Sequence, residues 1–106
     1  MIVDFLTNYT RGWIIGDFAP SIIKTKSFEI GILFHPKGEQ RPPHFHSQIT
    51  EYNILVSGKM KINNKVLMPG TIFIFEPYEI ANPEFLDDCM VICVKIPSIP
   101  DDKHII

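Results

Sequence analysis

The chain has 106 residues, of which 45% are hydrophobic and 21% charged, and its formal net charge is −2. A chain of this length forms one domain, with room for one core and one small pocket. The near-neutral charge offers no basic surface for nucleic acid or an anionic membrane. No apolar run approaches the ~20 residues of a membrane helix. We therefore expect a single globular domain that binds neither nucleic acid nor a membrane.

The first residues do not read as a signal peptide. Asp4 comes early, and no basic start or apolar core leads to a small-residue cleavage site. The only cysteines are Cys89 and Cys93. On a strand they stand about 13 Å apart, beyond the ~7 Å that a disulfide allows. We expect two buried free thiols and a cytoplasmic protein.

The pattern of turns and apolar runs predicts an all-β domain. Residues 1–26 are irregular, apart from an apolar run at 13–15 that predicts an edge strand. Further strands are expected at 28–35, 49–56, 59–62, 66–68, 72–75 and 89–96. Turn signals recur roughly every eight to twelve residues, which is typical of a β-sandwich or β-barrel. We interpret 1–106 as one domain, with an N-terminal arm over 1–26 and a barrel core over 28–97.

The N-terminal arm carries four aromatic residues. They are Phe5, Tyr9, Trp13 and Phe18. Aromatic side chains in the arm of a small domain usually complete a core, and packing across a dimer or closing over a ligand are the alternatives.

Two histidines and a glutamate form a candidate metal site. His44 and His46 are two residues apart, which on a strand puts both rings on one face with Cα atoms ~6–7 Å apart. Imidazole nitrogens bind metals at ~2.0–2.1 Å. Glu51 adds a carboxylate five residues later. Two imidazoles and one carboxylate with open positions suit non-haem Fe(II), and also Mn, Zn or Ni.

The segment around these residues resembles the first motif of the cupin superfamily, Gly-x5-His-x-His-x4-Glu-x6-Gly. Gly38, His44, His46, Glu51 and Gly58 match it without a gap. The resemblance implies a double-stranded β-helix, which is a jelly-roll barrel, with the two histidines and the glutamate pointing into it. It also implies a homodimer.

The second cupin motif, Gly-x5-Pro-x-Gly-x2-His-x3-Asn, matches less well. Gly70 fits its start, but the place of its histidine, which would be the fourth ligand, falls on Ala81. A methyl group cannot ligate a metal. A site with three protein ligands still resembles catalytic zinc sites. Water or the side-chain oxygen of Asn82 is then a candidate for the vacant position.

Three more residues are candidates for binding a substrate. Alternation along the 49–56 strand puts Asn53 on the face of Glu51, where its amide needs a ligand, a water or a neighbouring strand as partner. Arg41 lies in the loop before the motif, where it either makes a forked contact with an anionic group or is solvated. His35 precedes Pro36 and is either a pocket residue or a surface residue.

Three functions are compatible with these residues. In the first, His44, His46 and Glu51 hold a divalent ion (Fe, Mn, Zn or Ni) and act catalytically on a small polar molecule such as a sugar or an organic acid. The second is a metal-free sugar-nucleotide isomerase or epimerase, in which His44 or His46 moves a proton, as in some cupin relatives. The third is a non-catalytic module that binds a small ligand. We favour the first, a metal-dependent enzyme whose reaction the motif does not specify.

Overall fold

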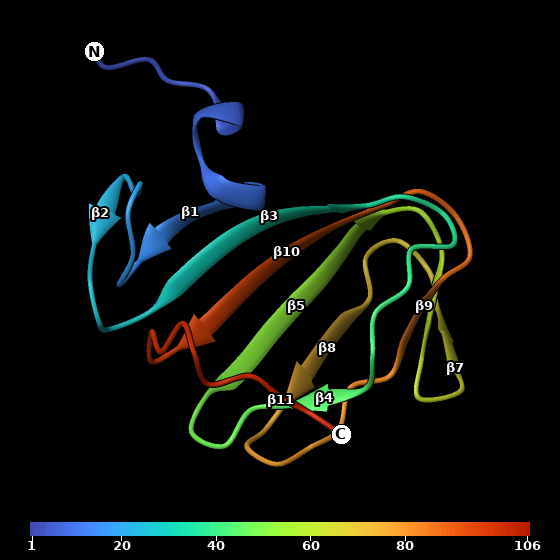
Figure 1. Cartoon of the computed structure of the whole chain (residues 1–106). Helices are drawn as coiled ribbons and strands as arrows, with labels where there is room; N and C mark the ends of the chain where they lie inside the picture. Colours follow the sequence, from blue (N-terminus) through green and yellow to red (C-terminus); the bar gives the residue numbers. More distant parts are fainter.

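The structure, a computed structural model, describes residues 1–106 and consists almost entirely of β-strands (Figure 1). Two short 3₁₀ helices, η1 (Leu6–Asn8) and η2 (Thr10–Gly12), precede the strands. The strands are β1 (Trp13–Gly16), β2 (Ile23–Lys24), β3 (Glu29–His35), β4 (His44–Phe45), β5 (Thr50–Ser57), β6 (Met60–Ile62), β7 (Lys65–Leu67), β8 (Ile72–Phe75), β9 (Pro83–Phe85), β10 (Cys89–Ile96) and β11 (His104–Ile105). The all-β prediction is confirmed. The structure contains no helix with the length and apolarity needed to cross a bilayer.

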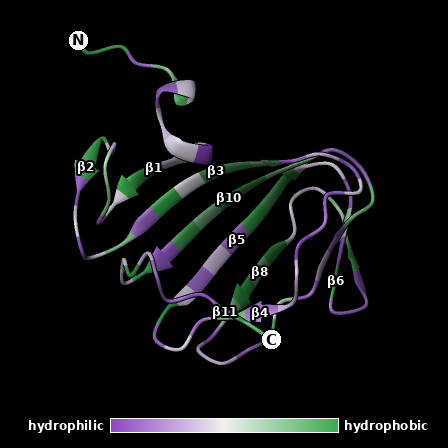
Figure 2. Cartoon of the chain, viewed as in Figure 1, coloured by the Kyte–Doolittle hydropathy of each residue, from purple (hydrophilic) through white to green (hydrophobic).

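The strands form one large sheet and two small sheets, and the small sheets face the large one. The large sheet has the order β2-β1-β3-β10-β5-β8 and is antiparallel except where β1 pairs with β2 (Figure 1). The small sheets have the orders β7-β6-β9 and β11-β4. A hydrophobic core contains residues from both layers, among them Leu55 of β5, Met60 of β6 and Phe85 of β9. Apolar residues dominate β8 and β10, which contribute to this core (Figure 2).

Alternation along each strand of the large sheet separates its two faces. In β10, Cys89 and Cys93 are buried and free, which confirms the prediction of two buried thiols. The opposite face of β5, β8 and β10 is also apolar. We call the following residues the outer apolar face: Tyr52, Ile54, Val56, Ile72, Ile74, Met90, Ile92 and Val94.

The glycine that closes the first motif occupies a position no other residue can fill without strain. Gly58 has φ +91°, and a Cβ built there lies 2.2 Å from the carbonyl oxygen of Asp88. Only glycine adopts this conformation without a steric cost. It lets the chain leave β5 and turn back into β6 against the start of β10.

Several strands differ from the sequence-based expectation. The run at 13–15 does form a strand, but β1 is not at the edge, because β2 pairs with it in parallel. The sequence pattern does not predict β2, β9 and β11, since each has only two or three residues and carries no visible alternation. Beyond the predicted barrel core over 28–97, β11 pairs with β4 and adds a further strand from the C-terminal segment.

The C-terminal segment is held by the carboxylate of Asp102. This side chain is buried and accepts hydrogen bonds from the backbone N–H groups of Ser47, Gln48 and Ile49 and from the Ser47 hydroxyl. Burial raises the pKa of Asp102, but these hydrogen bonds lower it further, so that the pKa lies well below its usual value. A buried carboxylate with several N–H donors is stable only when it stays ionised.

We expect Asp102→Asn to lower the free energy of unfolding by about 1–3 kcal/mol, because hydrogen bonds to a charged acceptor are lost. Urea denaturation measures this change. Asp101→Asn is the matched control, since the Asp101 side chain is exposed and holds no loop. Equal stability of the two variants would contradict the role given to Asp102.

Candidate functional site

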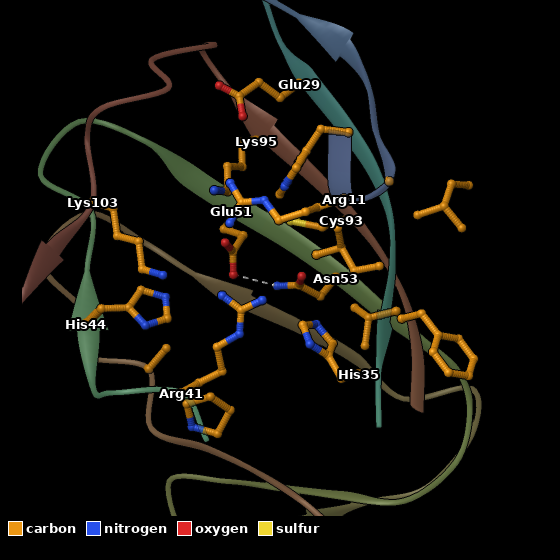
Figure 3. A pocket seen from close by; sticks show the side chains of 18 of the residues that line it. Arg11, Glu29, His35, Arg41, His44, Glu51, Asn53, Cys93, Lys95 and Lys103 are labelled. Atoms are coloured by element: carbon orange, nitrogen blue, oxygen red, sulfur yellow. Dashed lines mark hydrogen bonds between the residues drawn. The ribbon is translucent and has the colours of Figure 1, made fainter. Parts of the chain in front are cut away.

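One cavity between the layers, of about 700 Å³, contains most of the residues that the sequence singled out. His44, Glu51, His35, Arg41 and Asn53 line it (Figure 3), and so does His46. The volume lies within the range of small-molecule sites. The structure therefore brings six of the seven candidate residues to one place.

His46 lies at the inner end of this cavity and is held by the C-terminal segment. Its Nδ1–H donates a hydrogen bond to the backbone carbonyl of Asp102. A carbonyl only accepts, so Nδ1 carries a proton, and in the neutral ring the lone pair is then on Nε2. Nε2 is buried, has no hydrogen-bond partner and lies 3.4 Å from Oε1 of Glu51. Buried polar atoms without a partner are rare, so this nitrogen is placed to meet a ligand or an ion.

His44 is arranged in the same way on β4. Its Nδ1 lies 3.1 Å from the carbonyl oxygen of Pro42, which leaves the lone pair on Nε2. Burial lowers the pKa of His44, which favours the neutral ring. The His44 and His46 ring centroids are 5.7 Å apart, with the rings at 76°.

The position of the missing fourth ligand lies directly opposite His44. The backbones of His44 and Ala81 form an antiparallel bridge. The distance from His44 N to Ala81 O is 3.1 Å, and that from Ala81 N to His44 O is 2.8 Å. Ala81 is buried and lines the cavity with its methyl group. This side of the site has no metal-binding atom.

Glu51 lies on the inner face of β5 and stays ionised. Burial raises its pKa, but the contact with His46, the Lys95 ammonium and the Asn53 amide lower it to about 2. Asn53 donates to Glu51 Oε2 at 3.0 Å and to the carbonyl of Phe73 at 3.4 Å. The partners of the Asn53 amide are thus Glu51 and the neighbouring strand.

Glu51 is part of a row of charged side chains that crosses three strands of the large sheet. We call Glu29, Lys95 and Glu51 the inner charged row. Lys95 of β10 is directly opposite Glu29 of β3 on one side and Glu51 of β5 on the other. Opposite charges in facing positions of neighbouring strands attract each other. The Lys95 ammonium also lies 4.7 Å from the centroid of Trp13, in a cation–π contact.

His35 is a cavity residue, so its interpretation as a surface residue is wrong. It is buried, stacks on Phe85 at a centroid distance of 4.3 Å, and its Nδ1 lies 2.5 Å from Glu39 Oε2. Arg41 Nε donates to the same oxygen at 3.1 Å. The sequence did not single out Glu39, because its link to His35 forms only when the 36–43 loop folds back over the end of β3.

Asn82 does not reach the site. Its side chain is exposed and lies outside the cavity, and its backbone N–H donates to the Asn63 side chain at 2.9 Å. The reason is alternation: Ala81 points inward, so Asn82 points outward. The proposal that it fills the fourth metal position is therefore wrong.

No three histidine, cysteine, aspartate or glutamate side chains lie close enough together, as they stand, to hold one ion. His46 and Glu51 are adjacent, and His44 faces the same cavity. Two imidazoles whose Nδ1 atoms face backbone carbonyls and one ionised carboxylate are nevertheless the donor chemistry of divalent metal sites. The donor set fits such an ion. His44 has to approach His46 and Glu51 before all three can bind it.

Sequence comparisons give no match, either among protein-family models or among curated proteins. Solved structures do match. KdgF from Halomonas sp. has a TM-score of 0.67 at 21% identity, covering 73% of this chain and 76% of its own. A conserved protein with a double-stranded β-helix domain from Klebsiella pneumoniae has a TM-score of 0.68 at 16% identity, covering 91% and 84%. The pirin of Escherichia coli, solved in complex with nickel(II), has a TM-score of 0.68 at 14% identity, covering 83% and 39%.

These matches show the fold. The chain is a double-stranded β-helix of the cupin type, as the first motif indicates. Because the identities are low, the matches say nothing further about the ligand of this chain.

Burial lowers the pKa of His35, so the unfolded chain takes up the proton first as the pH falls. The free energy of unfolding should therefore fall from about pH 7 to about pH 5, across the ordinary histidine pKa. His35→Gln should remove part of this pH dependence. The part that comes from His44, whose pKa is also lowered, should remain. Urea denaturation at several pH values measures it. An unchanged pH dependence in His35→Gln would contradict the buried, neutral state of this ring.

Proposed function

We propose that this protein binds a divalent metal ion through His44, His46 and Glu51 and acts as an enzyme on a small polar molecule in the same cavity. The observation that carries the proposal is the buried, unpartnered Nε2 of His46 facing an ionised carboxylate. We expect Fe, Mn, Zn or Ni, because imidazole and carboxylate donors suit these metals. The pirin solved with nickel(II) supports the proposal as a neighbour of the same fold.

The surroundings of the two histidines support this role. Histidines that ligate metals usually donate their other ring N–H to a carbonyl or a carboxylate. His46 and His44 both do so, to the carbonyls of Asp102 and Pro42. Asn53 holds Glu51 from the other side. The three ligands are thus oriented by the chain itself.

The protein would act on a substrate at the open side of the site, beside the methyl group of Ala81. A bound ion supplies Lewis-acid polarisation of a substrate oxygen. Phe73 and Phe75 line the cavity with apolar surface. The substrate that we propose for this cavity is a small polar molecule, for example a sugar or an organic acid.

A metal-free isomerase or epimerase is the second candidate. The neutral ring of His44, with Nε2 free in the cavity, favours it as a proton acceptor. A non-catalytic binding module is the third candidate, and saturable binding without turnover identifies it. Metal content separates the first candidate from both.

We expect Glu51→Gln and His46→Ala to lower the affinity for Mn²⁺, Fe²⁺, Zn²⁺ or Ni²⁺ by at least about tenfold, because each removes one ligand. Calorimetric titration of chelator-treated protein and elemental analysis of protein purified without chelator measure this loss. Glu84→Gln is the matched control, since Glu84 is exposed on β9 and outside the cavity. Absence of metal from the wild type, with no binding in the titration, would refute the metal site.

We further propose a homodimer that pairs through the outer apolar face, in a reducing compartment such as the cytoplasm. The side chains of this face include no charged group, and Ile72, Ile74 and Tyr52 are exposed to 68%, 48% and 41%. Two-fold pairing places a surface against itself, which an uncharged apolar surface tolerates without charge repulsion. Two free buried thiols support the reducing compartment.

Ile74→Asp should convert the dimer into a monomer, because it places a charge within the proposed interface. Light scattering coupled to gel filtration measures the mass. Val66→Asp is a control of similar exposure on β7, in the other layer (48% against 52%). A monomeric wild type, or a dimer that persists in Ile74→Asp, would contradict this interface.

A further inference from the structure

The cavity carries more positive charge than the chain as a whole. The chain has ten basic and twelve acidic residues. Four of the basic residues line the cavity (Arg11, Arg41, Lys95 and Lys103), against three acidic ones (Glu29, Glu39 and Glu51). A protein with net charge −2 therefore concentrates positive charge around its one large cavity. A divalent ion would add to this excess.

The four cations come from segments that lie far apart in the sequence. Arg11 lies in η2, Arg41 in the loop after β3, Lys95 in β10 and Lys103 just before β11. Figure 3 shows them around Glu51 and His44. Folding brings these like charges together, and the three carboxylates of the cavity balance only part of them.

Lys95 faces two glutamates of the neighbouring strands and Arg41 forms an ion pair with Glu39, whereas the other two cations have neither. Lys95 belongs to the inner charged row, and Arg41 uses its Nε for Glu39. Arg11 and Lys103 form no ion pair. Partial desolvation by the surrounding chain, and then the neighbouring cations with Arg41 first, lower the pKa of Lys103. We call Arg11, Arg41 and Lys103 the cationic rim.

Arg11 is held at the cavity by an unfavourable backbone conformation. Its φ of +50° lies in the left-handed region, which non-glycine residues rarely adopt. The next residue, Gly12, has φ +85°, and a Cβ built there would lie 2.0 Å from the carbonyl oxygen of Ile32. The turn is therefore packed closely against β3. Strained conformations of this kind are often found at ligand sites.

We propose that the cationic rim binds an anionic group, a carboxylate or a phosphate, of the small molecule that enters the cavity. The proposal rests on the proposed function only in placing the ligand in this cavity, since the rim belongs to the chain and needs no metal. The guanidinium of Arg41 keeps its Nη donors for a forked contact with two oxygens. Arg11 and Lys103 supply the unpaired positive charge.

Matched pairs of an anion and its neutral counterpart test this proposal. Calorimetric titration compares glucuronate with glucose, glucose 6-phosphate with glucose, and glycolate with ethylene glycol. Each titration uses both chelator-treated and Mn²⁺-treated protein. We expect at least one anion to bind at least about tenfold more tightly than its neutral counterpart, also after chelation, and more weakly as salt is added. The carboxylates and the phosphate ester distinguish the two possible groups.

Variants connect this preference to the rim. We expect Arg11→Ala, Arg41→Ala and Lys103→Ala each to lower the affinity for the preferred anion by about tenfold, with little effect on the neutral counterpart. Lys65→Ala is the control, since Lys65 is exposed on β7 and outside the cavity. The rim residues are not buried, so melting temperatures should change little.

The outcomes separate this proposal from the metal site. Anion binding that survives chelation, in a protein that takes up no metal, refutes the metal site and supports the rim. Metal binding without any preference for anions, or a preference that the rim variants do not change, overturns the rim. A preference found only in the Mn²⁺-treated protein also overturns it, because the ion alone then explains the binding.

Discussion

The register that places Lys95 between two glutamates of the neighbouring strands is the constraint on which the site depends. Glu29, Lys95 and Glu51 face each other across β3, β10 and β5, so each carboxylate has a cation in the neighbouring strand. An isolated buried carboxylate would instead take up a proton. Lys95, His46 and Asn53 keep Glu51 ionised. The inner face of the sheet can therefore carry charge at one end and a hydrophobic core around Leu55 at the other.

A second constraint connects the end of the chain to the site. The backbone carbonyl of Asp102 orients the His46 ring, while its carboxylate holds the turn from Ser47 to Ile49 that leads into β5. The same residue thus sets the tautomer of one histidine and the position of the strand that carries Glu51. Stability of the fold and geometry of the site are coupled here, because both depend on hydrogen bonds to Asp102.

The sequence predicts the parts of the site that depend on local pattern. The spacing of His44, His46 and Glu51 and the alternation along the 49–56 strand place these side chains in the cavity, as observed. The same alternation along 89–96 puts Lys95 on the face of Cys93, so the sequence pattern also predicts its place in the cavity. The contacts of His35 with Glu39 and of His46 with Asp102 have no local pattern. The first contact forms only when the loop after β3 folds back. The second forms only when the C-terminal segment, 56 residues beyond His46, packs against the site.

The central claim is that His44, His46 and Glu51 meet at one ion. Anomalous scattering from a crystal grown with Mn²⁺ tests this most directly. We expect one peak inside the cavity, within about 2.0–2.3 Å of both Nε2 atoms and of one Glu51 oxygen. A cavity without a peak, or a peak bound only by surface carboxylates, would contradict the account.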